Sequence, residues 1–263
     1  MSDWGEPFAE MRARAPLVQN ITNYVAMNVA ANALLAAGAS PAMVHAREEA
    51  AEFAALAQAL TINIGTPSGP WVEAMLAAAG AAQAARTPWV LDPVAVGATA
   101  FRRETAARLM ALGPSVVRGN ASEIIALSGA AAQGKGADSA DPVAAAEAAA
   151  RALAEASGAV VAVTGARDFV TDGPRAWRIA NGDPMMPRVT ALGCALTGIV
   201  GAFVAGAGDR AEATVAALVY FGLAGEVAAR EARGPGSFQG VFLDALYGLG
   251  PDTVRTGAKV QAA

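Results

Sequence analysis

The chain has 263 residues and a formal net charge of −4, with 54% hydrophobic and 16% charged residues. The acidic balance argues against binding to nucleic acid or to an anionic membrane, because both partners need a basic surface. The single cysteine excludes an intrachain disulfide, and the single histidine, His45, excludes a metal site built from several histidines and argues against a Ser/His/Asp triad.

Two segments of the sequence bear on the cellular location of the protein. The N-terminus carries early acidic residues and has no apolar stretch, so it is not expected to be a signal peptide. The uncharged run Val189–Gly208 is long enough to cross a bilayer. It starts as a turn and contains internal glycines, and no basic cluster flanks one end, so it is predicted to be a buried helix. These features predict a cytoplasmic protein.

Short apolar segments alternate with longer helical segments along the first two thirds of the chain. The predicted strands are Leu17–Gln19, Ser40–Val44, Thr61–Ile64, Pro88–Asp92, Ser115–Arg118 and Ala159–Thr164, followed by a hairpin of Asp168–Thr171 and Arg175–Ile179. The predicted helices are Asp3–Arg14, Tyr24–Ala37, Ala46–Leu60, Trp71–Ala85, Phe101–Leu112, Ala121–Leu127, Pro142–Ser157, one that begins near Cys194, Ala211–Arg230 and one around Phe238–Leu249.

This alternation predicts an α/β fold whose mostly parallel central sheet is covered by helices on both faces. No linker, repeat or change of composition divides residues 1–263, so a single domain is expected. Asn20–Asn23 is predicted to be a polar turn, and 128–141 a Gly- and Ala-rich loop. The tail Pro251–Ala263 is expected to be poorly anchored.

Ligands of open α/β sheets bind beyond the carboxyl ends of the strands, so the residues that end strands are candidates for the site. Asp92 precedes a proline; it either organises a magnesium shell or only forms an Asp-Pro turn. Glu123 is either a second carboxylate on the magnesium side or only a capping-box partner of Asn120. Arg118 either pairs with a phosphate or is a solvated strand terminus.

The turn before Cys194 leads directly into a long apolar helix. A helix start presents free backbone N–H groups and the positive end of the helix dipole, which suits an anion. The thiol of Cys194 would face that anion, and a helix N-terminus is expected to lower its pKa. The alternative is a buried core helix in which the cysteine is only a small apolar residue.

The segment Gly129–Lys135 has almost the spacing of a phosphate-binding P-loop. Gly136 stands where the motif needs a Ser or Thr for magnesium, and the segment follows a helix instead of a strand. A P-loop is therefore rejected. Lys135 remains a candidate for a loop contact with a phosphate.

Several short motifs, in this order, together resemble those of one family: Leu17–Val25, Ser40–Met43, Asn63–Thr66, Leu91–Val94, Gly119–Ile124, Gly134–Ser139, Val163–Gly165 and Leu192–Cys194. The family is that of the hydroxyethylthiazole kinases of thiamine biosynthesis. The resemblance implies a ribokinase-like α/β fold and a homotrimer with active sites shared between subunits. It also implies transfer of the γ-phosphoryl group of ATP to the hydroxyl of 4-methyl-5-(2-hydroxyethyl)thiazole, with Mg²⁺.

The resemblance assigns a first set of residues to the thiazole substrate. Asn20 and Met43 would contact the thiazole, and Gly65 and Thr66 would close the pocket from the neighbouring subunit. Gly193 would lie where the substrate hydroxyl meets the γ-phosphoryl group.

A second set is assigned to the phosphate side. Asp92 and Glu123 would lie near the magnesium, and Arg118 and Thr164 near the nucleotide phosphates. Cys194 would lie beside Gly193 at the reacting groups, either as a weak base or only to orient the hydroxyl.

One departure from the family pattern concerns the turn itself. The family often has Thr-Gly-Thr/Ala-Gly-Cys, whereas Ala191 and Leu192 precede Gly193 here. A side chain at Ala191 restricts the backbone of the turn. Two other functions stay open: a kinase of the same fold acting on another small alcohol, such as a hydroxymethylpyrimidine, and a trimeric binding module without turnover.

Overall fold

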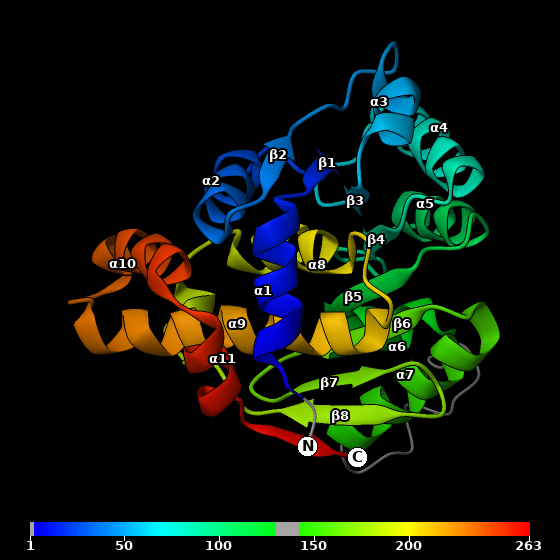
Figure 1. The fold of residues 1–263 in the computed structure, drawn as a ribbon. Coiled ribbons are helices and arrows are strands. Elements are labelled where there is room, and N and C mark those ends of the chain that lie inside the picture. Colours follow the sequence, from blue (N-terminus) through cyan, green and yellow to red (C-terminus); the bar gives the residue numbers. More distant parts are fainter. Residues whose placement is uncertain (1–2, 130–141) are drawn as a thin grey trace.

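The computed structural model describes residues 3–129 and 142–263, and one sheet runs through them in the strand order β2-β1-β3-β4-β5-β6-β7-β8-β9 (Figure 1). The strands are β1 (Leu17–Ile21), β2 (Ser40–Ala42), β3 (Ala59–Asn63), β4 (Trp89–Asp92), β5 (Val116–Asn120), β6 (Val160–Thr164), β7 (Asp168–Thr171), β8 (Ala176–Ile179) and β9 (Val260–Ala262). Neighbours from β2 to β6 are parallel, whereas β7, β8 and β9 are added antiparallel. The predicted α/β fold with a mostly parallel sheet is confirmed.

The helices cover both faces of this sheet. They are α1 (Gly5–Arg14), α2 (Met27–Ala37), α3 (Ala50–Leu56), α4 (Gly69–Ala85), α5 (Ala100–Met110), α6 (Ala121–Leu127), α7 (Pro142–Ser157), the 3₁₀ turn η1 (Met186–Arg188), α8 (Leu192–Val204), α9 (Arg210–Glu231), α10 (Pro235–Gly248) and α11 (Pro251–Gly257). Successive strand residues point to opposite faces. Val90 of β4 accordingly packs with the α8 and α9 side, and Leu91 packs with α4 and α5.

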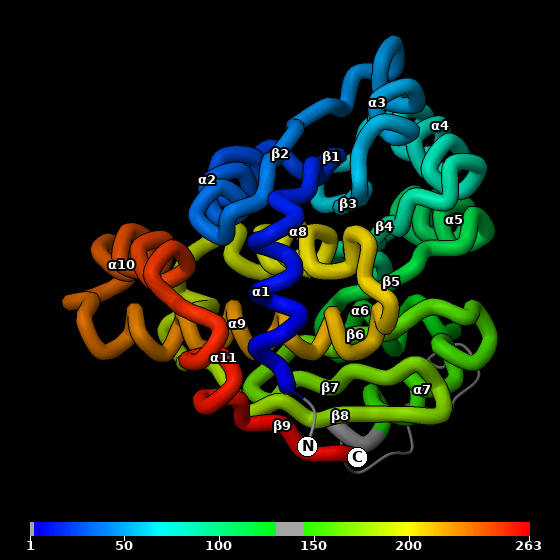
Figure 2. The backbone as a smooth tube through the Cα atoms, viewed as in Figure 1, coloured from blue at the N-terminus to red at the C-terminus, as the bar shows by residue number. Residues whose placement is uncertain are grey.

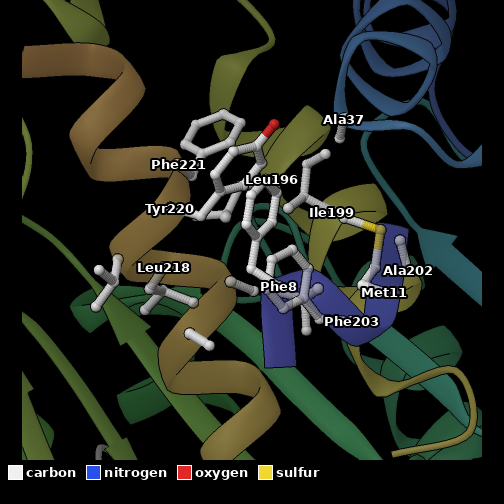
Figure 3. Close-up of a cluster of buried hydrophobic side chains, with 14 of the residues drawn as sticks. Phe8, Met11, Ala37, Leu196, Ile199, Ala202, Phe203, Leu218, Tyr220 and Phe221 are labelled. Atoms are coloured by element: carbon white, nitrogen blue, oxygen red, sulfur yellow. The ribbon is translucent and has the colours of Figure 1, made fainter. Parts of the chain in front are cut away.

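Helix α8 is the centre of the larger layer. It contacts β1, β3 and β4 below it, α2 and α9 beside it, and α1, which crosses over α8 and α9 in Figure 1. Phe8 of α1 stacks on Tyr220 of α9 with ring centroids 4.5 Å apart, next to Phe203 of α8 (Figure 3). A Cβ on Gly201 would lie 2.6 Å from Thr61, so glycine allows α8 to approach the sheet closely. The prediction that this uncharged segment is a buried helix is confirmed.

A second apolar helix, α9, is long and apolar enough to cross a membrane by length and composition. Within its most apolar window, 83% lies buried inside the protein. The packing of the core therefore explains why α9 is apolar on most of its circumference.

Several predicted boundaries are wrong, and the cause is packing in the sheet. The helix predicted over Ala46–Leu60 ends at Leu56, because Ala59 and Leu60 pair with β1 and are fully buried. Alanine favours a helix only weakly, and tertiary contacts override such preferences. Asn20, predicted in a turn, lies inside β1 for the same reason.

The C-terminal tail is anchored, contrary to expectation. Residues 251–257 form α11, and β9 pairs antiparallel with β8 (Figure 2). This pairing covers the backbone groups that β8 would otherwise leave exposed at the sheet edge. Arg151 also donates to the carbonyl oxygen of Ala263 at 3.2 Å. The Gly134–Ser139 motif and Lys135 lie outside the described residues.

Candidate active site

The parallel register gathers the polar strand ends under the start of α8. Asn63 of β3 pairs with Asp92 of β4, and Asn120 of β5 pairs with Thr164 of β6. Because side chains alternate along a strand, Asp92 and Arg118 fall on the face that carries α8. Both make polar contacts with that helix, Asp92 through Thr197 and Arg118 through Gly193.

Asp92 is a carboxylate with one satisfied and one free oxygen. Its Oδ2 atom accepts hydrogen bonds from Asn63 Nδ2 at 2.7 Å and from Thr197 Oγ1 at 2.8 Å. Its Oδ1 atom is buried and finds no hydrogen-bond partner among the described residues, although the side chain is only 1% exposed. Burial raises the pKa of Asp92 to about 6, and the positive charge of Arg118 only partly offsets that rise.

Arg118 ties the end of β5 to the first turn of α8. Its Nη1 atom donates to the carbonyl oxygen of Gly193 at 3.0 Å, and its Nη2 atom donates to Thr164 Oγ1 at 2.6 Å. Nη1 also lies 3.5 Å from Asp92 Oδ2. A Cβ at Gly193 would lie 3.4 Å from Arg118 Nη2, an ordinary van der Waals contact, so the guanidinium lies directly against this turn. Four predicted site residues therefore meet here.

Glu123 holds two loops together. Its Oε1 atom accepts the N–H of Ala95 at 2.9 Å, and its Oε2 atom accepts the N–H of Asn120 at 2.8 Å. Asn120 Oδ1 in turn accepts the N–H of Glu123, so the capping box considered as an alternative is present. The negative charge of Glu123 also raises the pKa of Asp92, which places the two carboxylates within electrostatic range of each other.

Cys194 lies in the first turn of α8, which begins at Leu192 and not at Cys194. Ala191 precedes the helix with φ 65°, so the turn adopts a left-handed conformation despite its side chain. The Cys194 sulfur accepts a hydrogen bond from Asn23 Nδ2 at 3.3 Å. Burial, followed by the charge of Asp92, raises the pKa of the thiol, so the prediction of a lowered pKa is wrong.

The residues expected to contact the thiazole are more dispersed. Asn20 is 2% exposed; its Nδ2 atom donates to Val18 O and its Oδ1 atom accepts from Thr61 Oγ1. Met43 follows β2, is half-buried and packs on the α8 side of the sheet. Gly65 and Thr66 adjoin the segment after β1, where Thr66 Oγ1 accepts the N–H of Tyr24 at 3.3 Å.

Three further residues complete the site and were not assigned to it from the sequence; Asn23 was expected only as a candidate cap of the helix Tyr24–Ala37. Asn63 and Thr197 hold Asp92, and Asn23 contacts both Asn63 and Cys194. Asn63 could have been recognised from the sequence, because it lies at the end of a strand. It also follows the buried polar residue Thr61 by two positions and so points to the same face of the sheet. Asn23 and Thr197 become recognisable only when α8 is placed on the sheet.

The residues present fit a magnesium ion that is held mainly by phosphates and water. Within residues 3–129 and 142–263, no group of three or more His, Cys, Asp or Glu side chains is arranged to hold a metal. Kinases commonly hold Mg²⁺ through one or two carboxylates plus substrate phosphates and waters. The unpartnered Oδ1 atom of Asp92, with Glu123 nearby, suits that mode.

Comparison with known proteins identifies the family of the chain. The sequence model of the hydroxyethylthiazole kinase family matches residues 8–252. A hydroxyethylthiazole kinase of Cereibacter sphaeroides is 70% identical over 263 residues, covering all of both chains. The chain belongs to the hydroxyethylthiazole kinase family. Another relative with the same name, from Rhizobium johnstonii, is 63% identical over 260 residues and covers 98% of this chain and 97% of its own.

Solved structures support the fold of this hydroxyethylthiazole kinase family member. A hydroxyethylthiazole kinase protein from Pyrococcus horikoshii OT3 superposes with a TM-score of 0.92 at 42% identity, covering all of both chains. A pyridoxal kinase from Staphylococcus aureus superposes with a TM-score of 0.59 at 15% identity over 78% of this chain and 86% of its own. The second likeness concerns the fold alone. The expected ribokinase-like fold is confirmed.

Proposed function

We propose that the protein transfers the γ-phosphoryl group of ATP to the hydroxyl of 4-methyl-5-(2-hydroxyethyl)thiazole, a step of thiamine biosynthesis or salvage. Family membership over residues 8–252 supports the reaction class and the substrate. The observation that carries the proposal is the contact of Arg118 with both Gly193 at the start of α8 and Thr164 at the end of β6. This contact places a fixed positive charge beside a helix start.

Phosphoryl transfer depends on positioning and charge stabilisation more than on covalent chemistry. The first N–H groups of α8, which have no partners within the helix, would bind the transferring phosphoryl group near Gly193. Arg118 and Thr164 would lie beside the nucleotide phosphates. The buried ion pair and hydrogen bonds of Arg118 hold its guanidinium in place before the nucleotide arrives.

Asp92 and Glu123 would hold the magnesium, Asp92 through its Oδ1 atom and Glu123 from the first turn of α6. When bound, Mg²⁺ supplies positive charge that neutralises the β- and γ-phosphate oxygens. Cys194 would contact the substrate hydroxyl. The raised pKa keeps most of the thiol protonated near pH 7, so its proposed role is to orient the hydroxyl, and only the small thiolate fraction can accept the hydroxyl proton.

Met43, Gly65 and Thr66 are proposed to line the thiazole pocket. Asn20 is proposed to support that pocket from beneath, because its amide already bonds to Val18 and Thr61. A neighbouring subunit is proposed to complete the pocket in a homotrimer. Next to Thr66, Tyr24 is 70% exposed and Val25 is 57% exposed, and adjacent exposed apolar side chains are typical of a contact surface.

We also propose that residues 1–263 act as one domain and that the enzyme works in the cytoplasm, where ATP is available. The sheet that continues from β2 to β9 through the described residues supports a single domain.

A coupled assay of ADP release tests the proposed function. The thiazole alcohol should support turnover with ATP and Mg²⁺, and hydroxymethylpyrimidine should support much less under the same conditions. Turnover with the pyrimidine alone would assign the site to another alcohol of similar size. Calorimetric binding of ATP and thiazole without product would identify a binding module and refute the proposal.

A further inference from the structure

Asn23 uses all of its hydrogen-bonding capacity, which fixes the orientation of its amide. Its Oδ1 atom accepts the backbone N–H groups of Val25 at 3.1 Å and of Ala26 at 3.0 Å. Its Nδ2 atom donates to Asn63 Oδ1 at 2.9 Å and to Cys194 Sγ at 3.3 Å. An amide can make two donor and two acceptor bonds. A flipped amide would face two N–H groups with its own donors, so Asn23 always presents a donor to the sulfur.

Asn63 is held in the same way. Its Oδ1 atom accepts the N–H of Gly65 at 2.9 Å as well as Asn23 Nδ2, and its Nδ2 atom donates to Asp92. Both asparagines are buried, and a Cβ at Gly65 would lie 2.7 Å from Asn23 Nδ2. The hydrogen bonds therefore run in one direction: Asn23 donates to Asn63, and Asn63 donates to the Asp92 carboxylate.

We propose that Asn23 is a positioning residue for phosphoryl transfer, which occupies one lone pair of the Cys194 sulfur and leaves its hydrogen and second lone pair for the substrate hydroxyl. The proposal rests on the proposed function, because it assumes that the alcohol meets Cys194. The Asn23 donor stabilises negative charge on the sulfur, so it favours the thiolate that can take the hydroxyl proton and become a neutral thiol. The same hydrogen bond opposes the rise in thiol pKa caused by burial and by Asp92.

The two ends of the Asn23 amide have separable roles. The oxygen supports the turn before α2 through Val25 and Ala26, which is a structural role. The nitrogen contacts the sulfur. Asn23→Asp keeps an acceptor for the turn, removes the donor to Cys194 and to Asn63, and places a negative charge beside the sulfur. Asn28→Asp, which adds the same charge on the exposed first turn of α2, is the matched control.

Alkylation by iodoacetamide measures the thiol without any substrate, because Cys194 is the only cysteine of the chain. Asn23→Asp should slow alkylation at fixed pH by at least about tenfold, because it removes a hydrogen bond to the thiolate and adds a negative charge beside it. Its kcat should fall while the KM for the thiazole alcohol changes little. Asn28→Asp should match the wild type in both measurements.

A second variant keeps the test decisive if Asn23→Asp fails to fold. Gly65→Ala keeps the Asn23 amide and adds no charge, but its Cβ would lie within 3.0 Å of Asn23 Nδ2, Asn23 Cβ and Asn63 Oδ1, so the amide must move and alkylation should slow. Alkylation at the wild-type rate in the folded variants would overturn the proposal. Slowed alkylation of the variants, together with a wild type that shows no ADP release, would uphold the hydrogen bond to the thiol but refute both the proposed function and a positioning role in it.

Discussion

Replacing Asp92 with asparagine is expected to raise the stability of the protein at neutral pH while it lowers turnover. Burial raises the pKa of this carboxyl from 3.8 to about 6, so the folded protein binds the proton more tightly than the unfolded chain does. The resulting stabilisation is fully present below pH 3.8 and is lost as the pH rises through about 6. Each pKa unit corresponds to about 1.4 kcal/mol, so a shift of about two units predicts a loss of about 3 kcal/mol.

Asparagine does not ionise, so the Asp92→Asn variant should not lose this stability as the pH rises. Relative to the wild type, its free energy of unfolding should increase by up to about 3 kcal/mol between about pH 4 and about pH 8. The amide oxygen can still accept from Thr197, whereas Asn63 loses a carboxylate partner at a cost of about 1 kcal/mol. That cost does not vary with pH, so it does not change how the stability difference between the variant and the wild type depends on pH.

The assay is urea denaturation followed by tryptophan fluorescence across this pH range, with turnover and thiazole binding measured on the same preparations. Turnover should fall strongly while thiazole binding is retained, because the variant loses a carboxylate on the magnesium side. A stability difference that is constant with pH would show that Arg118 fully compensates the buried charge, and would refute the argument. Unchanged turnover would assign Asp92 to turn formation only.

Three other predictions concern the reacting groups, the phosphate side and the assembly. Cys194→Ala should lower kcat by about 10²-fold, whereas Cys194→Ser and Cys194→Asp should remain active. Gly193→Val should lower kcat more than Cys194→Ala does, because the valine side chain meets Arg118. An inactive Cys194→Ala together with a nearly normal Gly193→Val would identify the thiol as the catalyst. Arg118→Lys should raise the KM for ATP and lower kcat, since one ammonium cannot span Gly193 and Thr164 as the planar fork does; unchanged ATP kinetics would contradict this. Sedimentation should show a stable trimer, and an active monomer would remove the shared pocket.

The sequence alone determined the class of the fold and much of the phosphate side of the site. Strands that alternate with helices imply a parallel sheet, and parallel strands end at one edge. Asp92, Arg118 and Thr164 could therefore be predicted to meet, because each lies at or near the carboxyl end of its strand and all three point to one face of the sheet. The uncharged run that forms α8 was also recognisable as a buried helix.

The tertiary structure decided what depends on contacts between distant segments. The boundary between α3 and β3 follows from pairing with β1, and the anchoring of the tail follows from the free edge of β8. The thiol pKa of Cys194 follows from burial and the nearby Asp92, which local sequence does not record. The donor that Asn23 presents to that sulfur exists only because α8 packs onto the ends of β1 and β3. Local sequence preferences determine which segments become helices or strands. The desolvation of a side chain and its hydrogen-bond partners depend on how the helices pack on the sheet.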